Sequence, residues 1–177
     1  QGTLAAARPS KAVTFVENHD TQPFQSLLSP VEPWFKPHAY AFILLRAEGY
    51  PCVFYADYYG ATYAARKGEP DVQLYSHRFL IDRFLKTRHE YGYGDQHDYF
   101  DHPNTVGWVR TGSGEHPGVM AVVMTNGSAG DKWMNTYRPA ATFTDATGHF
   151  AHQVTANADG WANFPCPAGS VSVWLQD

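Results

Sequence analysis

The sequence is poor in charge, and neither sign dominates it. Of its 177 residues, 13 are Lys or Arg and 17 are Asp or Glu, so the formal net charge is −4. A domain that binds nucleic acid usually carries a basic surplus, and this sequence has none. The longest apolar run covers residues 39–45, far fewer than the roughly 20 residues that cross a bilayer. We therefore expect no nucleic acid and no membrane among the partners.

Cysteine is also scarce, because Cys52 and Cys166 are the only two. They form no CxxC pair and no disulfide framework, so two free buried thiols are favoured over one bridge between them. The N-terminal residues 1–4 include neither Met nor the apolar stretch of a signal peptide. We interpret this end as a cut rather than a natural start, and the compartment stays unknown.

The overall composition is typical of a globular protein, with 44% hydrophobic and 15% aromatic residues. A length of 177 residues suits one ordinary domain or two small ones. The same length excludes a complete (β/α)8 barrel, which needs about 250 residues. Any relation to a barrel fold must therefore be partial.

The first half of the sequence alternates predicted strands and helices. Residues 12–16 and 52–55 are short apolar runs without polar alternation, as in strands that are buried on both faces. A buried helix is predicted for residues 34–48, with Pro37 in its first turn. Apolar positions at helical spacing predict an amphipathic helix within residues 72–90. Together these patterns predict an α/β arrangement with parallel strands.

The second half of the sequence has a different pattern. Short apolar runs recur about every ten residues, and turn residues separate them. The clearest runs are residues 106–109, 119–124, 141–143 and 171–175. This spacing predicts a small antiparallel β domain, a sandwich or Greek key. We therefore divide the chain into an α/β part, residues 1–92, and an all-β part, residues 93–177.

Polar and aromatic residues follow both predicted parallel strands. Asn18, His19 and Asp20 come after the first strand, and Asp57 with its neighbouring tyrosines comes after the second. Ligands of parallel α/β sheets bind at the carboxyl ends of the strands. Carboxylates, imidazole and aromatic rings at one sheet edge suit a sugar. The alternative is that Asn18 and the acidic residues only form the turns.

The residues around the first strand end resemble a known enzyme family. Residues 11–22, Lys-Ala-Val-Thr-Phe-Val-Glu-Asn-His-Asp-Thr-Gln, resemble the strand-seven motif F-x-x-N-H-D of the α-amylase family of retaining glycoside hydrolases. Further similarity to the liquefying, bacterial-type members follows in the family's order, in residues 34–37, 39–44, 49–55, 91–94, 96–101, 106–108, 160–161 and 169–173. The resemblance implies that residues 1–92 are the last two β/α units of a (β/α)8 TIM barrel. Residues 93–177 would be the C-terminal antiparallel β-sandwich domain.

The resemblance also implies roles for two residues. Asp20 matches the family's third essential carboxylate, which helps to stabilise the oxocarbenium-like transition state, and His19 matches the histidine that binds the same sugar. The substrate would be an α-glucan such as starch or glycogen, cut at internal α-1,4 bonds. The nucleophilic Asp and the acid/base Glu of the family precede this segment. We therefore expect that the chain alone is inactive and needs the rest of the barrel for a closed fold.

Calcium is the cofactor that the resemblance suggests. In some bacterial members a calcium ion lies between the barrel and the β domain, and its ligands match the His97 carbonyl, the Asp98 carboxylate and Asn126. The family has an Asp at the last position, and a neutral ligand there weakens a calcium site. The other interpretation is that residues 89–102, rich in His and acidic residues, form a polar junction. Their spacing matches no zinc or iron pattern.

Two other functions stay open on the residues alone. The chain could be a non-catalytic carbohydrate-binding module that contacts glucan through Trp133 or the tyrosines of residues 55–59. Trp108, Trp161 and Trp174 stand among apolar residues and are assigned to the core, whereas Trp133 follows a turn. A metal-binding β domain is the remaining alternative. One residue departs from the family pattern, since Ala56 stands where the family has Gly.

Overall fold

The computed structural model describes residues 2–65 and 68–177. The chain divides into two compact units. The first consists of Gln1–Leu44 and Glu48–Asp82, and the second consists of Leu45–Ala47 and Arg83–Asp177. The division between residues 92 and 93 that the sequence suggested stays a prediction.

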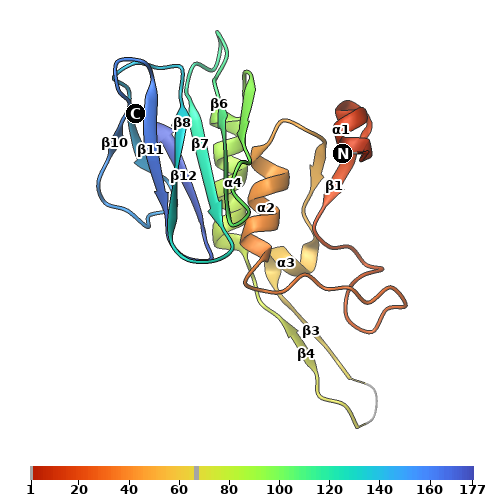
Figure 1. The fold of residues 1–177 in the computed structure, drawn as a ribbon. Helices are drawn as coiled ribbons and strands as arrows, with labels where there is room; N and C mark the ends of the chain where they lie inside the picture. The colour runs from red at the N-terminus through yellow and green to blue at the C-terminus, as the bar shows by residue number, and fades with distance from the viewer. Residues whose placement is uncertain (1, 66–67) are drawn as a thin grey trace. The chain divides into compact units, whose positions relative to one another are not determined.

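The first unit contains a pair of parallel strands joined through a helix (Figure 1). Its elements, in chain order, are α1 (Leu4–Ala7), the 3-10 turn η1 (Pro9–Lys11), β1 (Val13–Phe15), α2 (Lys36–Leu45), β2 (Tyr50–Cys52), α3 (Tyr55–Tyr59), β3 (Ala61–Tyr63), β4 (Val72–Leu74) and the start of α4 (Arg78–Tyr91). Val13 lies opposite Tyr50, and Phe15 lies opposite Cys52. The predicted parallel strand–helix–strand unit is therefore present.

Two details of the predicted strands are wrong. The second strand is β2 rather than residues 52–55, and Tyr55 already begins helix α3. The strands are also not buried on both faces, because Val13 is 63% exposed and Tyr50 is 76% exposed. Within the described residues β1 and β2 pair only with each other, so each strand keeps a free edge. Their apolar side chains consequently face solvent.

Helix α2 begins at Lys36, two residues later than the sequence predicted. Pro37 lies in the first turn, where its missing N–H breaks no helical hydrogen bond. After the helix the chain bends at Gly49, which has φ of +84°. A Cβ atom there would lie 2.6 Å from Cγ2 of Thr14 in β1. Only glycine therefore fits at the point where the chain comes close to β1 and begins β2.

A hairpin that the sequence did not predict follows α3. Strands β3 and β4 are antiparallel, with Ala61 opposite Leu74, and they extend away from α3 (Figure 1). The helix predicted within residues 72–90 is shorter at its start, because Val72–Leu74 belong to β4. Helix α4 therefore begins only at Arg78.

The second unit is built from antiparallel strands (Figure 1). They are β5 (Gln96–Tyr99), β6 (Thr105–Arg110), β7 (Met120–Thr125), β8 (Gly130–Asn135), β9 (Thr142–Asp145), β10 (Val154–Thr155), β11 (Trp161–Cys166) and β12 (Val171–Gln176). Six of them form a sheet in the order β10-β9-β12-β7-β6-β5, and β8 pairs with β11. Every pairing in this unit is antiparallel. The predicted antiparallel β domain is confirmed.

The core of the second unit lies between the larger sheet and the β8–β11 pair. These two strands pack against β6, β7 and β12, and the core includes Met134, Phe164 and Trp174. Trp108 and Trp174 are fully buried, as predicted, whereas Trp161, also assigned to the core, is only partly buried at the start of β11. Trp133 is 53% exposed, which also agrees with the sequence.

The two cysteines are free, as predicted, but they differ in exposure. Cys166 is buried, and its thiol donates to the carbonyls of Val123 and Ser170 at 3.4 and 3.3 Å. Cys52 is exposed, so its predicted burial is wrong, because β2 lies at an open edge. Across residues 2–65 and 68–177, no helix combines the length and the apolar character that a membrane crossing requires.

Candidate active site at the end of strand β1

The residues after β1 form a tight turn organised by Asn18. Its Oδ1 accepts hydrogen bonds from the backbone N–H groups of Asp20, at 2.9 Å, and Thr21, at 3.1 Å. The Thr21 hydroxyl oxygen in turn accepts the N–H of Asn18 at 3.1 Å. Asn18 is therefore occupied by the turn, as a short amide side chain often is.

The turn leaves His19 and Asp20 projecting into solvent. Their side chains are 81% and 55% exposed, and His19 Nε2 lies 3.3 Å from Asp20 Oδ1. One imidazole and one carboxylate next to each other can donate to and accept from neighbouring sugar hydroxyls. The structure thus brings the two sequence-predicted site residues together at the end of β1.

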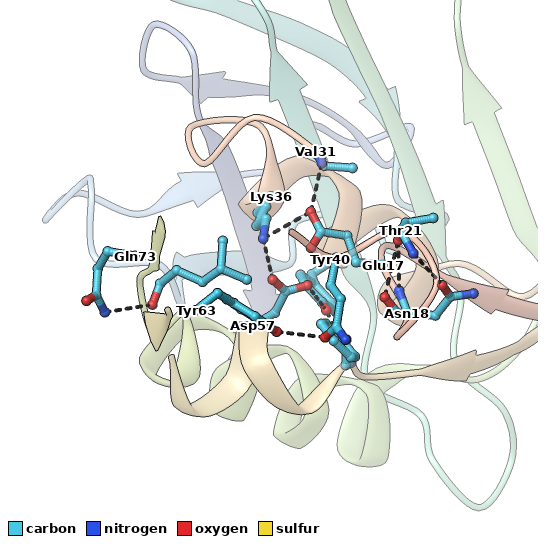
Figure 2. A network of polar contacts seen from close by, with 12 residues as sticks. Glu17, Asn18, Thr21, Val31, Lys36, Tyr40, Asp57, Tyr63 and Gln73 are labelled. Carbon is cyan, nitrogen blue, oxygen red and sulfur yellow. Dashed lines mark hydrogen bonds and ion pairs between the residues drawn. The ribbon is translucent and has the colours of Figure 1, made fainter. Parts of the chain in front are cut away.

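Glu17, the residue before this turn, belongs to a buried ionic network that the sequence did not reveal (Figure 2). Lys36, the first residue of α2, stands between Glu17 and Asp57. Its Nζ lies 3.1 Å from Oε1 of Glu17 and also pairs with Oδ1 of Asp57. All three side chains are almost fully buried, so these charges interact with little screening by water.

The network holds two carboxylates but one ammonium group, so it carries excess negative charge. The hydroxyl of Tyr40 donates to Oδ2 of Asp57 at 2.6 Å and offsets part of that charge. Burial, followed by the bond to Asp57, raises the pKa of Tyr40 far above its ordinary value, so the phenol stays protonated. Oε2 of Glu17 has no hydrogen-bond partner among the described residues.

The network also affects a neighbouring histidine. Burial, and then the charge of Lys36, lowers the pKa of His77.

The predicted site residues after the second strand are not free to bind a sugar in the expected way. Asp57 is fully buried and committed to Lys36 and Tyr40. Tyr58 donates to Oδ1 of Asp82 at 2.6 Å, which raises the pKa of Tyr58. Ala56 lies inside helix α3, where a methyl group causes no backbone conflict. Asp57 is therefore a structural residue.

The predicted calcium ligands do not fit one ion. Asp98 pairs with Trp108 in β6, whereas Asn126 lies just beyond β7, opposite the end of β6 at Asn104. This register separates Asp98 and Asn126 by two strands and four residues, or more than about 15 Å. Two ligands of one Ca²⁺ lie within about 5 Å of each other, because each is 2.3–2.6 Å from the ion on average.

The side chains of this predicted set are also engaged elsewhere. Asp98 forms a two-pronged ion pair with Arg46, with distances of 2.7 and 2.9 Å from Nη1 to Oδ1 and from Nη2 to Oδ2. The His97 ring lies beside Tyr137, with 3.2 Å between Nδ1 and the tyrosine hydroxyl. In the part of the chain that the structure describes, no three His, Cys, Asp or Glu side chains gather as a metal site would require. All of these contacts lie within the second unit.

Sequence reasoning missed Lys36 and Tyr40, although one signal was available. Lys36 is the only charged residue in the apolar helix Lys36–Leu45. A lone charge on such a helix needs a buried partner of opposite sign. The partners lie 19 and 21 residues away in the chain, so the pattern could not show which carboxylates they are.

Comparison with known proteins shows which enzymes the chain is similar to. Residues 120–175, in the second unit, match the family model described as Alpha-amylase C-terminal. The whole chain is 50% identical over 176 residues to the Alpha-amylase of Geobacillus stearothermophilus, a match that covers 98% of this chain and 31% of that protein. Along nearly its whole length, this chain is similar to alpha-amylases. It corresponds to the C-terminal portion of these proteins, so the family resemblance inferred from the sequence is confirmed.

A second alpha-amylase relative supports the same placement. The Glucan 1,4-alpha-maltohexaosidase of Bacillus sp. (strain 707) is 48% identical over 177 residues, covering 98% of this chain and 33% of that protein. The chain thus spans about a third of the length of both curated relatives. Their catalytic residues are not all contained in a segment of this size.

Solved structures related to the alpha-amylases share the fold at lower identity. The gamma-CGTase of an alkalophilic Bacillus clarkii has a TM-score of 0.66 at 21% identity, covering 95% of this chain and 26% of that chain. Alpha-amylase I of Eisenia fetida, crystallised with maltohexaose, has a TM-score of 0.65 at 14% identity, covering 93% and 41%. At these identities the likeness establishes the fold alone.

Proposed function

We propose that this chain is the C-terminal part of a retaining alpha-amylase that hydrolyses internal α-1,4 bonds of starch or glycogen. Asp20 stabilises the transition state in this enzyme, and His19 binds the same sugar. The observation that carries the proposal is the exposed His19–Asp20 pair, at 3.3 Å, on a turn at the carboxyl end of a parallel strand. That place is where α/β enzymes present their catalytic groups.

The proposal includes a place for the first unit in a larger fold. Strands β1 and β2, with their helices, are the last two β/α units of a (β/α)8 barrel. The exposed side chains of Val13 and Tyr50 and the free edges of both strands support this arrangement. Further strands of the enzyme would cover them, since apolar parallel strands are normally buried.

The division of labour within the reaction follows from the chemistry of retention. A retaining glycosidase needs a nucleophilic carboxylate and an acid/base carboxyl group about 5 Å apart. Asp20 is neither, and Asp57 is buried in its ion pair with Lys36. Both missing groups belong to the remainder of the enzyme. Asp20 accepts hydroxyl protons of the sugar under attack and favours the distorted ring of the transition state, and His19 donates to a hydroxyl of that sugar.

The experiment replaces Asp20 in the enzyme that contains this chain. Asp20→Asn keeps the shape of the side chain but removes the charge that opposes the developing oxocarbenium ion. We expect kcat on soluble starch to fall by about a hundredfold or more. Asp159→Asn, on an exposed turn of the second unit, is the matched control and should retain the full rate. A near-normal rate for Asp20→Asn would show that Asp20 only forms the turn.

The same assay applied to the chain alone addresses the missing groups. We expect no release of reducing sugar by residues 1–177. Clear turnover would contradict the assignment of the nucleophile and the acid to the remainder of the enzyme.

For calcium, we propose ligands in the enzyme other than the set His97, Asp98 and Asn126, because the strand register separates Asp98 from Asn126.

A second candidate function, glucan binding without catalysis, is favoured by one observation. The Trp133 ring is exposed on β8, and tryptophan rings stack well on sugar faces. Affinity electrophoresis in soluble starch tests this function. Retardation of the chain that disappears in Trp133→Ala would support it, and unretarded migration would exclude it.

A further inference from the structure

The loop that carries His19 and Asp20 is fastened at both ends by one buried carboxylate. Glu17 stands directly before the loop, and its Oε1 accepts the backbone N–H of Val31, at the far end, at 2.7 Å. Within the loop, the N–H of Ser29 donates to the carbonyl of Thr21 at 3.1 Å. A movement of the Glu17 side chain would therefore displace the whole loop.

Packing contributes little to holding this loop. Residues 25–30 are exposed, including the side chains of Leu27 and Leu28. Among the residues that the structure describes, Tyr63 makes a further side-chain bond to the loop, in which its hydroxyl donates to Gln22 Oε1 at 2.7 Å. Pro23 is buried at the start of the loop, and the polar contacts of Glu17 and Tyr63 hold the rest of it.

The position of Glu17 is set in turn by Lys36. Nζ of Lys36 lies 3.1 Å from Oε1 of Glu17, the same oxygen that accepts the N–H of Val31. On its other side Nζ pairs with Asp57 of helix α3, and Tyr40 holds the second oxygen of Asp57 at 2.6 Å (Figure 2). Helices α2 and α3 thus fix the ammonium, and the ammonium fixes Glu17.

We propose that Lys36 is a positioning residue for sugar hydrolysis, acting through Glu17 on the loop where His19 and Asp20 meet the sugar. The proposal rests on the function proposed above. Lys36 is buried and touches no substrate, so its effect is on geometry. A misplacement of catalytic groups by about 1 Å can cost about a hundredfold in rate.

The test measures kcat and KM on maltoheptaose for the enzyme that contains this chain. Lys36→Met keeps the length of the side chain but leaves two buried carboxylates without a cation. We expect kcat per folded molecule to fall by about 10-fold to 100-fold, with KM changed less than about threefold. Lys36→Arg restores a cation and should recover part of the lost kcat. Lys86→Met, which removes an exposed lysine of helix α4, is the matched control.

A second variant keeps the proposal falsifiable if Lys36→Met does not fold. Glu17→Gln retains an acceptor for the Val31 N–H but loses the ion pair, so kcat should fall about fivefold or more in a folded enzyme. A purely structural role for Lys36 would reduce the folded fraction and leave the kcat of that fraction unchanged. The proposal is overturned if the folded variants keep kcat within about twofold of the parent. An unmodified enzyme that does not cleave maltoheptaose would instead overturn the proposed function.

Discussion

Lys36 and its partners show how a buried charge is accommodated residue by residue. A lysine is almost never fully buried without a partner of opposite sign. Here Glu17 and Asp57 supply two such partners, and Tyr40 donates to the oxygen of Asp57 that does not pair with Lys36. The Tyr40 hydroxyl therefore bonds to a charged acceptor away from water, where such a bond is strong.

Removing that hydroxyl should destabilise the chain measurably. In Tyr40→Phe, Oδ2 of Asp57 keeps its burial but loses its donor. We expect the free energy of unfolding to fall by about 1–3 kcal/mol, the usual cost of an unsatisfied buried group. Urea unfolding of the chain measures the change. Tyr75→Phe, at an exposed position, should change the stability by less than about 0.5 kcal/mol, and equal losses in both variants would contradict the argument.

Among the elements, the entry into the β domain depends on one glycine. Between α4 and β5, Gly94 has φ of +76°, and a Cβ atom there would lie 1.8 Å from the carbonyl oxygen of Gly112. The two segments are held together by the N–H of Gly112, which donates to the carbonyl of Tyr93 at 3.1 Å. This close approach brings β5 into antiparallel pairing with β6.

Substitution at this crossing should therefore weaken the β5–β6 pairing. Gly94→Ala forces both a left-handed alanine and a backbone clash, so we expect a loss of about 2 kcal/mol or more. Gly114 has open space around its Cα, and Gly114→Ala is the matched control with an expected change below about 0.5 kcal/mol. Thermal unfolding followed by circular dichroism separates the two. Similar melting temperatures for both variants would count against the steric explanation.

The elements that the sequence predicted are those with apolar runs. Strand β7 has six buried positions in succession and was predicted almost to the residue. Strand β8 was not predicted, because it carries Asp131 and Lys132. The methylene groups of Lys132 are buried, and its Nζ lies 2.7 Å from Oδ1 of Asp101. A prediction that counts lysine as a polar, exposed residue therefore misses this strand.

Only the part of the candidate site that depends on neighbouring residues in the sequence could be predicted. His19 and Asp20 could be predicted because a strand end and a motif place them together within a few residues. The network around Lys36 forms only where the end of β1, α2 and α3 pack together. No local sequence pattern predicts that packing. The predicted calcium ligands illustrate the same limit of local information. Asp98 and Asn126 were matched by position, whereas the register of three strands keeps them apart.

At the scale of the whole molecule, the exposed apolar side chains of β1 and β2 distinguish the first unit from the second. The second unit buries its aromatic residues Trp108 and Trp174 completely. The first unit leaves Val13, Phe15 and Tyr50 in solvent. The chain that shows this contrast spans about a third of the length of its relatives.

The two cysteines allow the exposure of the two units to be compared by chemical labelling. Burial raises the pKa of the Cys166 thiol, and its bonds to two carbonyls keep it away from reagents. Cys52 is exposed on β2. We expect iodoacetamide to alkylate Cys52 in the native chain and Cys166 only after unfolding, as peptide mass spectrometry would show. Equal labelling of both would contradict the structure. In the longer enzyme, slower alkylation of Cys52 would record, without any engineered label, how closely the neighbouring segments cover this strand.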